Sequence, residues 1–140
     1  MTDKMTTIKF IEKMVLLTIE GRVSWATLPY YFEVNENEPL RRLVIANNRY
    51  AYNPIESNNM YLVNEYKSFC TILNGGVVII VASERKGKNK LSISIQTNSS
   101  HNIIPLYFDD DIYGKLTDLV LQITAKTNDS FKFINDILNL

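Results

Sequence analysis

The chain has 140 residues, the length of one domain, and a domain of this size buries roughly 70% of the surface that its unfolded form exposes. Its apolar fraction of 46% and charged fraction of 21% are those of an ordinary globular protein and exclude general disorder. Fifteen basic residues balance fifteen acidic ones, so no overall charge attracts nucleic acid or an anionic membrane.

The start of the chain, its apolar runs and its cysteine content indicate the cellular compartment. Met1 to Asp3 leads into an amphipathic segment, and it lacks the apolar run and small-residue cleavage site of a secretory signal. No stretch approaches the roughly 18 apolar residues of a membrane helix. Cys70 is the only cysteine, which excludes an intrachain disulfide. We therefore expect a cytoplasmic protein without membrane contact.

The first predicted element is a helix that Thr6 or Thr7 caps and that continues to about Glu20, with Gly21 just past its end. Such a helix packs along much of its circumference, because its apolar stripe is wide. We expect Trp25 to fold back over its base. Two adjoining rows make up the stripe: Ile8, Ile11, Val15 and Ile19 in one, and Phe10, Met14 and Leu17 in the other.

Residues 30–59 show neither helical nor strand periodicity, because Asn, Glu and Pro interrupt short apolar pieces. We expect an irregular, tyrosine-rich segment that could serve as a docking loop. Within it, Arg42 to Ala46 has the β-branched content of a strand, while Pro39 followed by Leu40-Arg41-Arg42-Leu43 would equally open a short helix. Met60 to Val63 then predicts a short strand.

The centre of the predicted fold is an antiparallel meander from Tyr66 to Gln96. Its strands are Lys67 to Leu73, Val77 to Ser83 and Leu91 to Gln96, joined by a turn at Asn74-Gly75-Gly76 and by a polar loop from Glu84 to Lys90. Asn-Gly between two apolar runs is a strong hairpin signal, because a type I′ turn needs positive φ at both central residues.

The turn also sets the pairing of the first two strands. It places Ile72 opposite Val77, Cys70 opposite Ile79 and Phe69 opposite Ile80. Both faces are apolar near the turn, so we expect these strands to be covered on two sides or to pack in an oligomer. One face carries Cys70, Ile72, Val77, Ile79 and Val81, and the other carries Phe69, Leu73, Val78 and Ile80.

The third strand has a different pattern from the first two. Leu91, Ile93 and Ile95 alternate with polar residues, which predicts one face exposed to water. The polar residues are Ser92, Ser94 and Gln96.

The last third of the chain predicts an edge strand and two helices. Ile103 to Phe108 forms the strand, at an edge because Pro105 lacks a ladder donor. One of Asp109, Asp110 and Asp111 caps the first helix, whose stripe is Ile112, Leu116, Leu119, Val120 and Ile123. After Thr127-Asn128-Asp129, a further helix is capped by Asp129 or Ser130 and packs through Phe131, Ile134, Ile137 and Leu138.

Together these elements predict an α+β domain. It has an N-terminal helix, an antiparallel meander of about four strands and two C-terminal helices packed on one face of the sheet.

Three features occur in order: the helix Ile8 to Glu20 running into Gly21-Arg22-Val23-Ser24-Trp25, the segment from Ser68-Phe69-Cys70-Thr71 to Asn74-Gly75-Gly76, and a later strand before an Asp-capped helix whose stripe ends at Ile123. In this the chain resembles a group of small bacterial proteins without assigned activity, often encoded near prophage or mobile-element genes. The resemblance implies a compact α/β domain and carries over no catalytic residue. It leaves Glu36 to Ser57 and Asp129 to Leu140 unexplained.

The residues that could carry catalysis have simpler structural interpretations. His101, the only histidine, lies in a polar turn, and Cys70 lies mid-strand among apolar residues, where a thiol is inert. Asp109 to Asp111 suits a helix start as well as a cation. We therefore expect no catalytic, cofactor-binding or metal-binding residues. An enzyme using carboxylate or tyrosine chemistry is the weaker alternative, and it needs a pocket at Asp109 to Asp111 or at Tyr50 and Tyr52.

Two binding hypotheses remain. The leading one is a non-enzymatic binding or regulatory protein that contacts another protein or itself, as a homodimer, through Tyr30, Tyr31, Tyr50, Tyr52 and Tyr61. The resemblance suggests a defence or counter-defence partner of bacteria and phages. The alternative is nucleic-acid binding through the loop residues Arg85, Lys86, Lys88 and Lys90, which the neutral total charge argues against.

Overall fold

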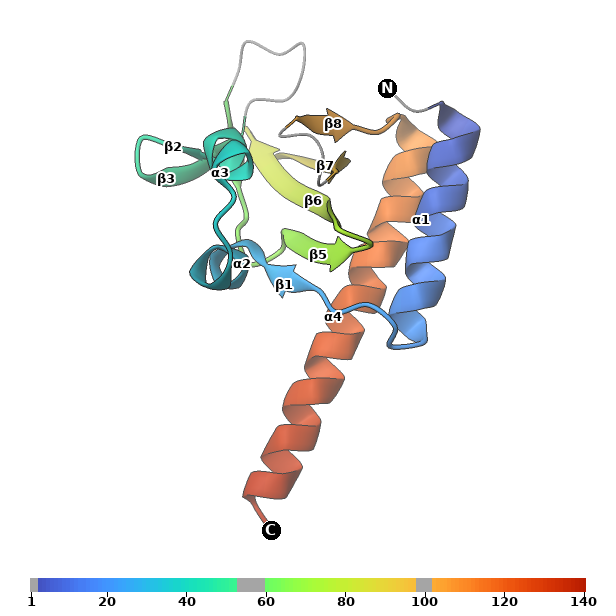
Figure 1. The fold of residues 1–140 in the computed structure, drawn as a ribbon, viewed down its shortest axis with the longest axis vertical. Coiled ribbons are helices and arrows are strands. Elements are labelled where there is room, and N and C mark those ends of the chain that lie inside the picture. Colours follow the sequence, from blue (N-terminus) through green and yellow to red (C-terminus); the bar gives the residue numbers. More distant parts are fainter. Residues whose placement is uncertain (1–2, 53–59, 98–101) are drawn as a thin grey trace.

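An antiparallel sheet runs through the centre of the molecule, and helices lie on both of its faces (Figure 1). The computed structural model describes residues 3–52, 60–97 and 102–140, except for the side chains of Tyr52, residues 128–132 and Asn135. The helices are α1 (Lys4–Ile19), α2 (Leu28–Val34), α3 (Glu38–Val44) and α4 (Asp110–Leu138). The strands are β1 (Ala26–Thr27), β2 (Ile45–Ala46), β3 (Arg49–Tyr52), β4 (Tyr61–Val63), β5 (Phe69–Leu73), β6 (Gly76–Arg85), β7 (Lys88–Gln96) and β8 (Ile103–Pro105).

Strand β6 organises the sheet because it has neighbours along both sides. It pairs with β7 on one side, and with β5 and then β4 on the other. β1 extends the sheet beyond β5, β3 and β2 extend it beyond β4, and β8 pairs only with β7. The α+β class and the edge position of Pro105 are confirmed. The described part of the chain has eight strands, however, where about four are predicted.

Three hairpins are closed by two-residue turns in which both central residues have positive φ. The turns are Asn47-Asn48, Asn74-Gly75 and Lys86-Gly87. This backbone matches the twist of the flanking strands, as in type I′ turns. The predicted pairing of Ile72 with Val77 is confirmed, together with those of Cys70 with Ile79 and Phe69 with Ile80. The polar loop predicted from Glu84 to Lys90 is wrong, because the strands continue to Arg85 and from Lys88.

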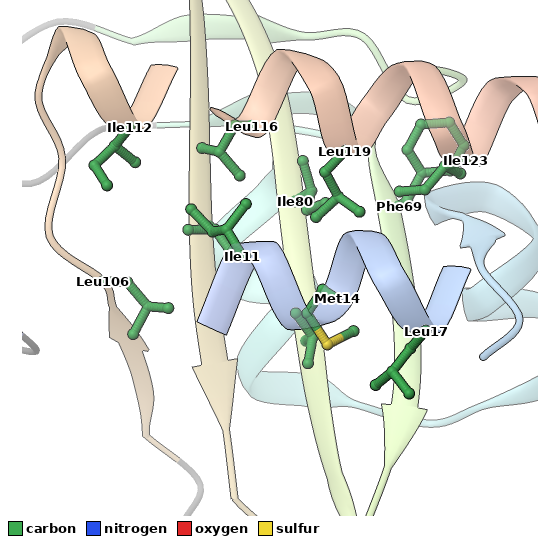
Figure 2. Packing of buried hydrophobic residues seen from close by; sticks show 12 residues of the cluster. Ile11, Met14, Leu17, Phe69, Ile80, Leu106, Ile112, Leu116, Leu119 and Ile123 are labelled. Atoms are coloured by element: carbon green, nitrogen blue, oxygen red, sulfur yellow. The ribbon is translucent and has the colours of Figure 1, made fainter. Parts of the chain in front are cut away.

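The first core lies between one face of the sheet and the pair of helices α1 and α4, which run side by side. In Figure 2 the side chains of Ile11 and Met14 from α1, and of Leu116 and Leu119 from α4, gather over Ile80 of β6. The predicted stripe of α4 is confirmed, since Ile112, Leu116, Leu119 and Ile123 are buried here. The buried members of the first core are Ile11, Met14, Leu17, Phe69, Val78, Ile80, Ile93, Leu106, Ile112, Leu116, Leu119 and Ile123.

The second core lies on the opposite face of the sheet, under α2 and α3. Residues of β6 alternate between the two cores, with Ile80 in the first and Ile79 in the second, because successive side chains of a strand point to opposite faces. The predicted cover of β5 and β6 on two sides is thus confirmed. The prediction that helices pack on one sheet face is wrong, because α2 and α3 lie on the face opposite to α1 and α4. The buried members are Leu28, Tyr31, Leu40, Val44, Val63, Cys70, Ile79 and Val81.

Residues 30–52 are regular, contrary to the irregular segment predicted. Leu28-Pro29 opens α2, and Asn37 caps α3 by accepting a hydrogen bond from the N–H of Leu40. Of the two alternatives at Pro39, the short helix is correct, and only Ile45–Ala46 of the proposed strand pairs with β3. The rest of the predicted docking loop, residues 53–59, lies outside the described residues.

The predicted wet face of the third strand is wrong at two of its three polar residues. Ser94 and Gln96 are 5% and 8% exposed, because α2, α3 and their connection cover this face. Gln96 tolerates burial because its amide pairs with that of Asn37.

The start and end of α1 show which side chains hold it. Asp3 caps the helix in place of the predicted Thr6 or Thr7, since its carboxylate accepts a hydrogen bond from the N–H of Thr6. The predicted return of Trp25 is confirmed, because its indole N–H donates to Thr18 Oγ1 at 3.0 Å.

The C-terminal region is one continuous helix, not the two predicted. Asp109 caps α4 by accepting a hydrogen bond from the N–H of Ile112, and the helix passes through Thr127-Asn128-Asp129 without a break. Asn and Asp favour caps but do not force a helix to stop as Pro does, so the intrahelical ladder continues. Its second half extends beyond the end of α1, away from the sheet (Figure 1).

Candidate functional site

The predicted interface tyrosines do not share one surface. Tyr31 is 4% exposed in the second core, where its hydroxyl accepts a hydrogen bond from Asn37. Tyr30 next to it on α2 is 58% exposed, and Tyr50 on β3 is half-buried. Burial raises the pKa of both Tyr31 and Tyr50. Tyr52 lies in β3 with its side chain outside the description.

The basic residues predicted as a loop lie together at the tip of the β6–β7 hairpin. Lys86 and Lys88 are exposed, while Arg85 and Lys90 are partly covered. Lys90 Nζ lies 5.6 Å from the centroid of the Tyr61 ring, within the range of a cation–π interaction. Tyr61 therefore positions a cation of this hairpin.

A hollow of about 370 Å³ lies beside that hairpin, and two further aromatic residues line it. Phe108 precedes α4 and is 42% exposed, and Tyr113 in the first turn of α4 is 37% exposed. Its other lining residues are Tyr61, Lys88, Asn89, Lys90 and Asp110. The sequence carries no signal for this grouping, because only the path through β8 brings the start of α4 next to the hairpin.

A second hollow, of about 420 Å³, continues from the first. It shares Asn89, Lys90 and Tyr113 with it and extends to Lys67 before β5 and to Thr117 on α4. We call these two adjoining hollows the track. Lys67, Lys88 and Lys90 line it, and its aromatic rings, Tyr61, Phe108 and Tyr113, all belong to the first hollow.

A groove of about 820 Å³ lies between the α2–α3 connection and the β5–β6 turn. An amide pair forms part of its wall: Asn37 Nδ2 donates to Gln96 Oε1 at 2.6 Å, and Gln96 Nε2 donates back to Asn37 Oδ1 at 3.2 Å. Asn37 also binds the Tyr31 hydroxyl and the Leu40 N–H. Its two donors and two acceptor positions are thereby all used inside the protein, which makes this network a structural support.

The free end of α4, residues 124–138, carries an exposed apolar stripe. Ile134 and Ile137 lie five helical turns beyond the buried Leu116 and Leu119, and so on the same side of the helix. Both isoleucines are 51% exposed, because α1 ends before it reaches them. Phe133 and Leu138 are further exposed members, and the exposed Leu140 follows just after the helix. Their spacing predicts packing, but the chain brings no described element against them.

Three of the residues considered for catalysis, Cys70, Asp109 and Asp111, have structural roles. Cys70 is 1% exposed, and burial raises the pKa of its thiol to about 12, so the reactive thiolate does not form near neutral pH. Asp109 and Asp111 both contact Lys4, at 2.7 and 2.8 Å. Within residues 3–52, 60–97 and 102–140, no three His, Cys, Asp or Glu side chains are grouped to hold a metal ion. His101 lies outside these ranges.

Comparison with known proteins gives no match to any family model, curated protein or solved structure. Among the described helices, none combines the length and the apolar content needed to cross a membrane.

Proposed function

We propose that this protein is a non-enzymatic binding protein that acts by protein–protein contact, and that the free end of α4 is its interface. The observation that carries the proposal is the exposed stripe on residues 133–138, where Phe133 is 65% and Leu138 is 76% exposed. Contiguous apolar surface on a free helix is stabilised by burial against a partner.

The partner that this stripe fits best is a second copy of the chain. The five exposed side chains present on the order of 500 Å² per copy, so two copies reach roughly the 1,000 Å² that a specific interface needs. A stripe on a straight helix can meet itself about a twofold axis, which closes the assembly as a dimer.

The test is the mass in solution, measured by size-exclusion chromatography with light scattering. The wild-type chain should give twice its 16.1 kDa, and the double variant Ile134→Glu/Ile137→Glu should give 16.1 kDa with the same unfolding midpoint at low concentration. The matched control is Leu16→Glu/Ile19→Glu, which places the same two charges on exposed apolar positions of α1, outside the free end of α4, and should remain a dimer. A wild-type monomer at high micromolar concentration would reject the interface.

A further inference from the structure

We infer that the track beside the β6–β7 hairpin binds single-stranded nucleic acid, with a base on Phe108 and Tyr113 and phosphates on the hairpin cations. This site is separate from the free end of α4 and does not depend on the dimer. The site recognises nucleotides of a strand through the flat face of a base and the phosphates beside it.

The aromatic part of the site comes from two neighbouring residues at the start of α4. Phe108 and Tyr113 line the hollow of about 370 Å³ and keep 42% and 37% of their surfaces exposed. Exposed aromatic rings in a concave surface are suited to stacking with a planar base, which every base can offer through its π face. The Tyr61 ring serves differently, because Lys90 already lies over it.

The cationic part of the site is the hairpin itself. Lys88 and Lys90 line the same hollow, and Arg85 and Lys86 continue the row of cations beyond it. The second hollow adds Lys67 along the track. Three cations, Lys67, Lys88 and Lys90, line the two hollows together with the acids Glu84 and Asp110. The lining is therefore net positive although the whole chain is neutral, and Arg85 and Lys86 add two charges at the hairpin tip outside the hollows.

The arrangement also orients the ligand and favours a strand over a free nucleotide. Asp110 lines the hollow, where its carboxylate repels a phosphate and accepts a hydrogen bond from a base amino group. The base therefore points toward α4 and the phosphate toward the hairpin. Because the cations extend beyond one hollow, more than one phosphate can be contacted at once.

The test uses the full chain and a fluorescently labelled single strand of roughly 16 nucleotides, followed by anisotropy at low salt. Wild-type protein should bind, and the affinity should fall steeply as salt rises. Tyr113→Ala and Phe108→Ala should each weaken binding about tenfold, as expected for loss of one stacked base. Lys88→Glu/Lys90→Glu should abolish it.

Matched controls separate this site from general charge and aromatic effects. Tyr30→Ala removes another exposed tyrosine, and Lys9→Glu/Lys13→Glu reverses two exposed charges on α1, so both should bind as the wild type does. Unlabelled mononucleotide and inorganic phosphate serve as competitors. Displacement by the mononucleotide at equal base concentration assigns the site to free nucleotides, while weak displacement assigns it to strands. No binding at low salt, or equal loss in the controls, overturns the site.

Discussion

Lys4 joins the starts of the two long helices, since its Nζ lies 2.7 Å from Asp109 Oδ2 and 2.8 Å from Asp111 Oδ2. The hydrogen bond from Lys4 lowers the pKa of Asp109, and the N–H of Ile112 lowers it further. The same contacts raise the pKa of Lys4. Asp109 therefore caps α4 and, through its ion pair with Lys4, ties α4 to α1.

This contact predicts a pH dependence of stability. A carboxylate whose pKa is lowered on folding contributes stability that is complete above its unfolded pKa of about 3.9 and is lost as the pH falls through the folded value. Asp109→Asn keeps a capping side chain but removes the charge, so the variant should be less stable than wild type at pH 6. The two urea unfolding curves should converge at the acid end. A stability difference that stays constant down to pH 2 would contradict the ion pair.

At the scale of elements, Gly76 in the β5–β6 hairpin and Gly114 in α4 differ in the space available for a side chain. A Cβ added at Gly76 would lie 2.9 Å from the backbone carbonyl oxygen of Gln96. Relieving this contact requires a shift of the backbone of β6 or β7. A Cβ at Gly114, on the exposed side of α4, would meet nothing within 4 Å.

Opposite effects are therefore expected from the same substitution at these two positions. Gly76→Ala should destabilise the fold by about 1–3 kcal/mol through overpacking. Gly114→Ala should stabilise it by about 0.5–1 kcal/mol, because alanine loses less backbone entropy in a helix. Chemical denaturation of both variants measures the difference. If Gly76→Ala were neutral, β7 would not approach the hairpin turn as closely as described.

At the scale of the whole molecule, one sheet separates two cores. The neighbours Ile79 and Ile80 are both fully buried, but they contact different helices, because they point to opposite sheet faces. Ile72 on the adjacent strand is 58% exposed.

This organisation predicts that consecutive residues of β6 are equally sensitive. Ile79→Ala and Ile80→Ala should each cost about 2–5 kcal/mol of unfolding free energy, since each leaves a cavity in a packed layer. Ile72→Ala should change it by less than about 0.5 kcal/mol. The measurement is equilibrium urea denaturation. An effect of Ile79→Ala as small as that of Ile72→Ala would mean that α2 and α3 do not form a second packed layer.

Prediction succeeded where a local pattern decides the structure. Asn74-Gly75 determines its own turn and, through it, the register of β5 and β6. The stripe of α4 from Ile112 to Ile123 follows from helical spacing. Prediction failed where distant segments meet: Ser94 and Gln96 are buried by helices that the pattern of their own strand does not reveal.

The candidate surfaces also combine residues that the sequence identifies with residues that only the tertiary structure brings together. The cations of the β6–β7 hairpin are adjacent in sequence and were identifiable, but Phe108 and Tyr113 join them only through the sheet. The spacing of Ile134 and Ile137 indicates an apolar stripe, yet the same spacing occurs in buried helices. Only the tertiary structure shows that this stripe has no described neighbour in the chain.

The sequence alone determined the turn at Asn74-Gly75, the pairing of β5 with β6 and the apolar stripe of α4, because each depends on residues a few positions apart. The tertiary structure decided which faces are covered, which tyrosines are buried and where the long helix leaves the body. These depend on contacts between segments far apart in the chain, and the period of a single element carries no information about what lies against it.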